Sequence, residues 1–186
     1  MLYATTVSSD DDLLQIHQLN QDNLKQNLSQ HEKQTEGFVS WLYSFQLLKK
    51  MHQLAPSVIV KDEHTLAGYA LSTLKESAVF HSDLQTMMNN LREVSYETNP
   101  LFSYNFYCMG QICIEKKYRG KGIFNMLYQK HRELYSPVYD LLITEISSSN
   151  IRSQKAHEKV GFKTIHQHKD DLDEWNVVVW DWNNSH

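Results

Sequence analysis

The sequence predicts a mixed α+β fold, with a central mixed sheet of about six to seven strands flanked by helices. Three observations favour this fold class. Short β-prone runs alternate with amphipathic segments along the chain. The longest β-prone run leads through a glycine turn directly into a helical pattern. The chain has 186 residues, of which 41% are apolar, so we expect one domain spanning residues 1–186.

The N-terminal half predicts a strand, two helices and a hairpin. Residues 2–7 are β-prone, and Ser9 with Asp12 three positions later starts a helical pattern as a capping box. Apolar residues three and four positions apart predict a second helix over residues 36–54. Two β-prone runs around a polar turn predict a hairpin over residues 57–74.

The C-terminal half begins with its least regular part, residues 75–104. A short helix that Ser82 caps is predicted there, followed by a loop that ends at Pro100. The remaining elements are predicted in the order strand 104–115, glycine turn, helix, strand 139–147, helix 150–160 with Gly161 as its C-cap, and a hairpin of residues 162–168 and 174–182.

Composition narrows the range of functions. A formal charge of -4 and a pI near 6.2 argue against a nucleic-acid partner, which would require a basic surface. The N-terminus has no signal-peptide pattern, and no apolar run reaches the length of a membrane span, so we expect a cytoplasmic protein without a membrane partner. Cys108 and Cys113 do not have zinc-ligand spacing, and we expect reduced core thiols and no metal site.

The turn at residues 118–122 is the strongest functional signal. A strand that runs through Gly120 and Gly122 into a helix presents free backbone N–H groups at a positive helix end, which suits a phosphate or pyrophosphate. Glycine allows close backbone approach and positive φ, and Arg119 and Lys121 add positive charge. The turn lacks the Walker A pattern, and Asn125 stands where the dinucleotide fingerprint needs its third glycine.

Two motifs carry a family resemblance. The stretch "ICIEKKYRGKGIF" resembles the acyl-CoA motif of GNAT-superfamily N-acetyltransferases, in which an apolar strand precedes Arg/Gln-x-x-Gly-x-Gly. About thirty residues later, "SSSNIRSQKAHEKVGF" is similar to the Asn-helix-Gly-Phe segment of that family. The matched positions are Arg119, Gly120, Lys121 and Gly122 in the first motif, and Asn150, Ser153, Ala156, His157, Gly161 and Phe162 in the second.

The resemblance implies a GNAT-like fold in which two neighbouring parallel strands, 107–115 and 140–147, splay apart and admit the pantetheine arm of acetyl-CoA. A backbone amide near Cys113 or Ile114 would then polarise the thioester carbonyl. The cofactor-binding residues that it implies are Ile112, Cys113, Ile114, Arg119, Gly120, Lys121, Gly122, Ile123, Phe124, Asn150 and Ser153. Phe124 departs from the family pattern, which has a small residue at that position.

Amine acetylation requires the removal of one proton and the delivery of another. On the helix after the Asn, the family often has a tyrosine that serves as the acid, and this chain has His157 at that position instead. Either His157 donates the proton, or it only packs and hydrogen-bonds. Glu145 is the candidate base if its strand phase turns it toward the ligand, and Gln111 is a candidate to orient a water. The acidic run at residues 170–174 either favours a cationic acceptor or is a solvated turn.

We therefore expect an acetyl-CoA-dependent N-acetyltransferase that transfers the acetyl group directly to a small-molecule or peptide amine in a ternary complex. The alternative is a non-catalytic acyl-CoA sensor or interaction module that keeps the cofactor cleft. The identity of the acceptor does not follow from any motif. A homodimer is common for such folds, but no interface can be assigned from the sequence.

Overall fold

The computed structural model describes residues 1–171 and 173–183, apart from the side chains of residues 34–36. Its core is a seven-stranded sheet in the order β1-β2-β3-β6-β7-β9-β8. Only the central pair β6–β7 is parallel among these neighbours, so the predicted mixed α+β class is confirmed. The strands are β1 (Leu2–Thr6), β2 (Val58–Asp62), β3 (Thr65–Thr73), β4 (Ser95–Tyr96), β5 (Asn99–Pro100), β6 (Phe106–Ile114), β7 (Leu141–Ser147), β8 (Lys163–Lys169) and β9 (Glu174–Asp181).

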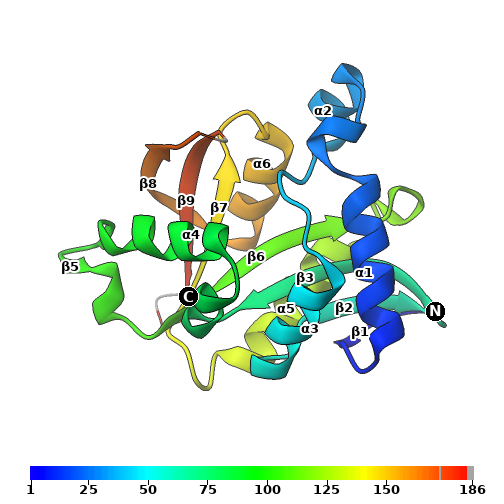
Figure 1. Cartoon of the computed structure of the whole chain (residues 1–186), viewed down its shortest axis with the longest axis horizontal. Helices are drawn as coiled ribbons and strands as arrows, with labels where there is room; N and C mark the ends of the chain where they lie inside the picture. The colour runs from blue at the N-terminus through cyan, green and yellow to red at the C-terminus, as the bar shows by residue number, and fades with distance from the viewer. Residues whose placement is uncertain (172, 184–186) are drawn as a thin grey trace.

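Helices cover both faces of the sheet. The α-helices are α1 (Asp10–Asp22), α2 (Gln30–Glu36), α3 (Phe45–Leu54), α4 (Ser82–Arg92), α5 (Ile123–Tyr135) and α6 (Ile151–Val160), with short 3₁₀ turns at Lys25–Asn27, Lys75–Phe80, Leu101–Ser103 and Lys116–Tyr118. Figure 1 shows α1, α3 and α4 in front of the sheet and α5 behind it. On the front face Ile16 and Leu48 pack with Tyr69, and on the back face Leu127 packs with Leu142.

The predicted helix over residues 36–54 is wrong in its first half. Helix α2 ends at Glu36, because Gly37 has a φ of +76°, and α3 begins only at Phe45, where the Ser44 side chain caps it. The intervening residues 37–44 run extended across the front of the molecule (Figure 1). The apolar spacing that predicted a helix there reflects side chains that line pockets, as described below.

The region 75–104 also differs from its prediction. Ser82 is the first residue of α4, and the cap is His81, whose Nδ1 accepts a hydrogen bond from the Asp83 amide at 3.2 Å. The expected loop contains the two-residue strands β4 and β5, which pair with each other. The other predicted strands, and the helices that follow the glycine turn and Asn150, are present.

The parallel pair β6–β7 separates partway along its length. Pairing runs from Phe106 with Leu141 to Cys108 with Ile143 and stops there, although β6 continues to Ile114. On the other side of β6, the register with β3 shifts between the Ala70–Ile112 and Ser72–Met109 pairs. This bulge bends β6 away from β7 and opens a gap in the middle of the sheet.

Candidate active site

Two adjoining pockets occupy the gap between β6 and β7. The first, here the turn pocket, has a volume of about 310 Å³ and includes the end of β6, the glycine turn and the starts of α5 and α6. The second, here the α4 pocket, has a volume of about 170 Å³ and lies among β6, β7, α4 and the β8–β9 turn. Both pockets are lined by Phe38, Val39, Ile112, Asn150 and Ser153, so the two pockets share a boundary.

The glycine turn presents open backbone to the turn pocket. Gly120 and Gly122 have φ values of +76° and +78°, and a Cβ added to either would meet nothing within 4 Å. Gly122 is the N-cap of α5, but no side chain caps this helix end, and its first turn holds no acidic residue. The first amides of α5 are therefore available to an anion, and positive φ and open space explain why glycine is needed at both positions.

The two basic residues of the turn behave differently. Arg119 lines the turn pocket, where its Nε donates to the Ile114 carbonyl at 3.2 Å and its Nη2 donates to Asn23 Oδ1 at 2.9 Å. Lys121 is not among the described lining residues; its Nζ lies 5.1 Å from the centroid of the Tyr118 ring. Arg119 is thus the better placed cation for a ligand, while Lys121 adds charge from outside the pocket.

Near the end of β6, the backbone N–H and C=O groups of every second residue face the gap. The Glu115 amide donates to the Ala67 carbonyl of β3 at 3.0 Å, so in the antiparallel ladder the backbones of Cys113 and Glu115 face β3. Ile112 and Ile114 then direct their N–H and C=O groups toward the gap, in agreement with the bond from Arg119 to the Ile114 carbonyl. Of the two amides expected to polarise a thioester, that of Ile114 is the one on the gap side.

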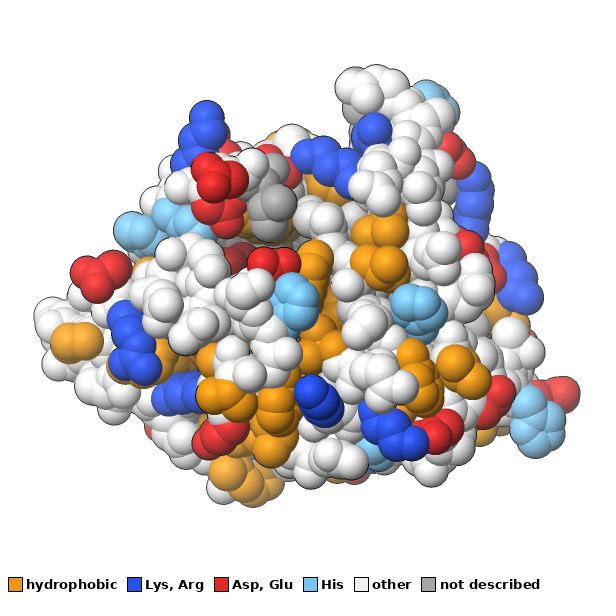
Figure 2. Space-filling view, in the orientation of Figure 1, with side chains coloured by type: hydrophobic (Ala, Val, Ile, Leu, Met, Phe, Trp, Pro, Cys, Tyr) orange, Lys and Arg blue, Asp and Glu red, His pale blue; other side chains and the backbone are white. Residues whose placement is uncertain are grey.

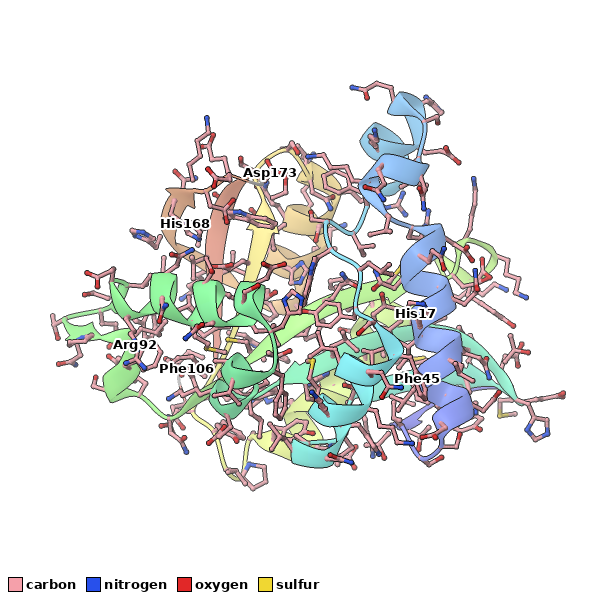
Figure 3. All side chains as sticks on the ribbon, in the orientation of Figure 1. His17, Phe45, Arg92, Phe106, His168 and Asp173 are labelled. Carbon is pink, nitrogen blue, oxygen red and sulfur yellow. The ribbon has the colours of Figure 1, made fainter. Side chains whose placement is uncertain are left out.

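Asn150 joins α6 to the 37–44 segment. Its Oδ1 accepts from the Ser153 amide at 3.2 Å, which caps α6, and its Nδ2 donates to the Phe38 carbonyl at 3.1 Å. The far end of the segment is held by α1, where His17 Nδ1 donates to the Tyr43 carbonyl at 2.8 Å and Asn20 bonds both Trp41 and Tyr43. Figure 3 shows His17 on the side of the molecule away from His168 and Asp173. The 37–44 segment therefore connects α1 on one side with the start of α6 on the other.

The two pockets carry opposite charge. Arg119 and Arg152 line the turn pocket, and no Asp or Glu does so among the described residues. Asp83, Glu145 and Asp170 line the α4 pocket, and no Lys or Arg does so in the described part of the chain. The field across the gap therefore favours an anion at the turn and a cation beside α4.

His157 lies at the junction of α5 and α6 and is 1% exposed. Its Nδ1 is 2.7 Å from the Ser153 carbonyl, which can only accept, so Nδ1 carries the proton. Its Nε2 then accepts from the Tyr128 hydroxyl at 2.6 Å. Burial lowers the pKa of His157 to about 4. Both nitrogens of this neutral imidazole are hydrogen-bonded, which favours the packing and hydrogen-bonding alternative over proton donation.

Glu145 faces the α4 pocket. Along β7, Leu142 and Ile146 pack on the α5 side and Ile143 packs with α4, so Glu145 shares the α4 face. Its Oε1 lies 2.9 Å from Nε2 of His168 on β8, and this hydrogen bond is the main cause that raises the pKa of His168. The strand phase left open by the sequence thus turns Glu145 toward the gap. The amide nitrogen of Gln111, by contrast, donates to the Trp41 carbonyl, and its amide oxygen accepts from the Tyr69 hydroxyl, so both ends of this amide are already bonded.

Two residues of the site, Gly110 and Tyr43, were not identified from the sequence. Gly110 sits in the β6 bulge, where an added Cβ would clash with Thr73 Oγ1 and lie 2.8 Å from the Tyr43 hydroxyl. Tyr43 lines the α4 pocket, is 2% exposed, and its hydroxyl has no hydrogen-bond partner within the described residues. A glycine inside a long strand is a weak indication of a bulge, but the approach of Tyr43 depends on the tertiary path of the 37–44 segment.

Cys113 is buried, and burial raises its pKa to about 12. Among the described residues, no group of three or more His, Cys, Asp or Glu side chains is arranged to hold a metal ion. Within the same residues, no helix has the length and apolar character needed to cross a membrane.

No protein-family model matches the sequence, and no curated protein matches it significantly. Solved N-acetyltransferase structures do match the fold over nearly the whole chain. The ribosomal-protein-S18-alanine N-acetyltransferase of Escherichia coli matches with a TM-score of 0.62 at 12% identity, covering 97% of this chain and 94% of that chain. An N-acetyltransferase from Staphylococcus aureus Mu50 matches with a TM-score of 0.61 at 17% identity, covering 97% and 98%.

A third structure, the NatC complex bound to Gag peptide and CoA, has a TM-score of 0.63 at 12% identity and covers 97% of this chain and 98% of that chain. At these identities the likeness shows the fold alone. The GNAT-like fold that the two sequence motifs implied is therefore confirmed, and this protein is similar in fold to solved N-acetyltransferases.

Proposed function

We propose that this protein transfers an acetyl group from acetyl-CoA to a primary amine by direct transfer in a ternary complex. The observation that carries the proposal is the pair of adjoining, oppositely charged pockets in one gap of the sheet. An anionic donor suits the basic turn pocket, and a cationic amine suits the acidic α4 pocket. The matches to an alanine N-acetyltransferase and to a complex holding CoA and a peptide support the same reaction.

The turn pocket fits CoA by its donors and its space. The uncapped amides of α5 and the Arg119 guanidinium would hold the pyrophosphate, and the open surroundings of Gly120 and Gly122 leave room for it. The gap-facing backbone of Ile112 and Ile114 would bond the pantetheine arm as an added strand, and the Ile114 amide is the expected donor to the thioester carbonyl. When bound, the donor supplies an activated acetyl thioester.

Proton transfer is assigned to the α4 pocket. Glu145 accepts a proton from the ammonium group of the acceptor, since its carboxylate lies in the pocket and its hydrogen bond to His168 orients it. His157 holds the start of α6 in place through Ser153. The Tyr43 hydroxyl has no protein partner among the described residues, and burial raises its pKa, so it stays protonated and is the candidate hydrogen-bond donor to the departing thiolate.

An acyl-enzyme on Cys113 is not part of the proposal. The thiolate is the nucleophilic form of cysteine, and burial raises the Cys113 pKa to about 12. The Cys113→Ala variant is therefore expected to retain turnover. Loss of turnover in this variant with CoA binding intact would favour a covalent intermediate instead.

The deciding experiment measures free CoA release from acetyl-CoA with a panel of primary amines. Release above background that depends on the amine, and that is lost in Glu145→Gln while CoA affinity stays unchanged, is the expected result. A protein that binds acetyl-CoA and releases no CoA with any amine would instead be an acyl-CoA sensor. Absence of CoA binding would contradict both functions.

A further inference from the structure

The α4 pocket holds more negative charge than one reacting amine requires. Glu145 lies on β7 and takes the role of base in the proposed function, on which this inference rests. Two more carboxylates, Asp83 of α4 and Asp170 of the β8–β9 turn, line the same pocket from different elements. Figure 2 shows acidic side chains around a hollow in this part of the surface. The pocket is therefore negative both in its interior and along its rim.

Within the described residues, no lysine or arginine pairs with the Asp83 carboxylate. Its one described ion-pair contact is His81, whose Nδ1 lies 3.8 Å from Oδ2. That nitrogen accepts a hydrogen bond from the Asp83 amide and therefore carries no proton in this geometry. The side chain is 45% exposed and lines the pocket, so its carboxylate is accessible to a ligand that enters there.

Asp170 lies beside an indole that also lines the pocket. Its Oδ1 accepts from the Asp173 amide at 3.0 Å and from Trp175 Nε1 at 2.9 Å, which fixes the carboxylate and the ring together. Trp41 lines the pocket from the 37–44 segment. Carboxylates and indole rings in one pocket are the groups that bind ammonium ions, through charge and through the π face of the ring.

A separate observation also indicates a polar ligand in this pocket. The Tyr43 hydroxyl faces the cavity beside Gly110 from a side chain that is 2% exposed, and it has no partner in the described residues. The side chain is buried, but its hydroxyl is open to the pocket and is not one of the buried polar atoms that lack a partner, so a polar group of a ligand can bond it there.

We propose that the acceptor is an amine carrying a second ammonium group, which lies at the rim between Asp83 and Asp170 beside Trp41 and Trp175. The reacting ammonium gives one proton to Glu145, its nitrogen bonds to the acetyl carbon as the carbon–sulfur bond breaks, and the second proton that the nitrogen loses balances the proton that the CoA thiolate takes up. The product keeps one positive charge and lacks the other. Attraction to the acidic pocket is then weaker for the product than for the substrate, which favours its release.

Three probes with the same reacting amine and a similar chain length test this proposal: 1,4-diaminobutane, butylamine and 4-aminobutanoate. We expect kcat/KM for the diamine to exceed that for butylamine by about tenfold or more, with 4-aminobutanoate below both. Asp83→Asn should reduce the advantage of the diamine several-fold. Glu93→Gln is the matched control, because Glu93 caps the other end of α4 and does not line the pocket. Equal kcat/KM values for the diamine and butylamine would overturn the proposal.

A binding measurement separates this proposal from the proposed function. Titration of the protein with each probe, followed by the fluorescence of the tryptophans at the pocket, requires no turnover. Preferential binding of the diamine without CoA release for any amine would contradict acetyl transfer and support recognition of two charges. Turnover of butylamine without any preference for the diamine, in binding or in rate, would support acetyl transfer and overturn the second-charge assignment.

Discussion

The Tyr128 hydroxyl donates a 2.6 Å hydrogen bond to Nε2 of His157, and this bond joins α5 to α6 behind the gap in the sheet. Because the Ser153 carbonyl fixes the proton of His157 on Nδ1, Tyr128 is the group that satisfies the second nitrogen. Both side chains are buried, and the edge of the His157 ring also meets the Phe124 and Phe162 rings. At the position where the family often has its acid, this chain therefore has a histidine that joins two helices and also lines the α4 pocket.

Tyr128→Phe should therefore act mainly on stability. It leaves the buried Nε2 of His157 without a donor, which we expect to lower the free energy of unfolding by about 1–3 kcal/mol in urea denaturation. Tyr139→Phe is the control, since the Tyr139 hydroxyl has no hydrogen bond within the described residues. A loss no larger for Tyr128→Phe than for Tyr139→Phe would show that the bond contributes nothing.

The pH dependence of stability should report two buried histidines. Burial lowers the pKa of both His131 and His157 from 6.5 to about 4. The folded chain keeps both rings neutral, whereas the unfolded chain protonates them as the pH falls below 6.5. Their contribution is thus complete above pH 6.5 and is lost as the pH falls from 6.5 toward 4, on the order of 3 kcal/mol for each ring.

Urea denaturation across this pH range measures the loss, and NMR titration of the imidazole protons assigns it. His168 acts in the opposite sense, because Glu145 raises its pKa, but it is partly exposed and we expect a smaller effect. The carboxylates Asp12 and Asp173 have lowered pKa values and lose their contribution in a lower pH range. Normal titration of both His131 and His157 near 6.5 in the folded protein would contradict the prediction.

The sequence predicted most of the sheet and the two helices next to the cofactor motifs, because strand and helix periodicities are local signals. It failed at residues 37–44, where Phe38 and Trp41 are apolar because they line pockets and not because they form a helix. Gly37 was the available warning, since its positive φ ends α2. The capping role of His81 was missed because a ring nitrogen is an unusual substitute for a Ser or Asp cap.

The residues of the candidate site also divide into those that the sequence predicted and those that it did not. Residues of the turn and the start of α6 lie together because each motif is continuous in sequence, and the structure brings both to one pocket. Glu145 on β7 and His168 on β8 meet across β9, which lies between their strands. Asp83 and Tyr43 reach the α4 pocket from separate front-face elements. No local pattern encodes such encounters, because they depend on strand order and on the path of the connections.

Tyr43→Phe tests the hydroxyl in the α4 pocket. Since this hydroxyl has no partner among the described residues, its removal should change the free energy of unfolding by less than about 0.5 kcal/mol. If it donates a proton or binds the acceptor, kcat/KM for amine acetylation should fall by about tenfold or more. Unchanged kinetics in a folded Tyr43→Phe protein would remove the residue from the mechanism.

Asn150→Asp separates two roles of one side chain. The aspartate retains an oxygen to cap the Ser153 amide, but it loses the donor to the Phe38 carbonyl. We expect α6 to stay formed by circular dichroism and amide exchange in residues 37–40 to rise by about tenfold. Asn150→Ala should in addition lower the free energy of unfolding by about 1 kcal/mol through the lost cap. Equal exchange in wild type and Asn150→Asp would show that the Asn150–Phe38 bond does not restrain the segment.

The glycine turn offers the most direct test of cofactor binding. Gly122→Val forces a branched side chain into a φ of +78°, and Gly120→Pro fixes φ near about -65° where the turn requires +76°, so both changes disturb the amides that face the turn pocket. We expect each to weaken CoA binding by about tenfold or more, equal to about 1.4 kcal/mol.

Lys121→Ala is the matched control within the same turn, because its ammonium group lies outside the pocket and contributes only a screened charge. Calorimetry with CoA on variants shown to be folded by circular dichroism measures the difference, and a CoA fragment without the pyrophosphate should bind all variants alike. If both glycine variants bind CoA as tightly as wild type does, the turn is only a connection between β6 and α5, and the assignment of the pyrophosphate to it is wrong.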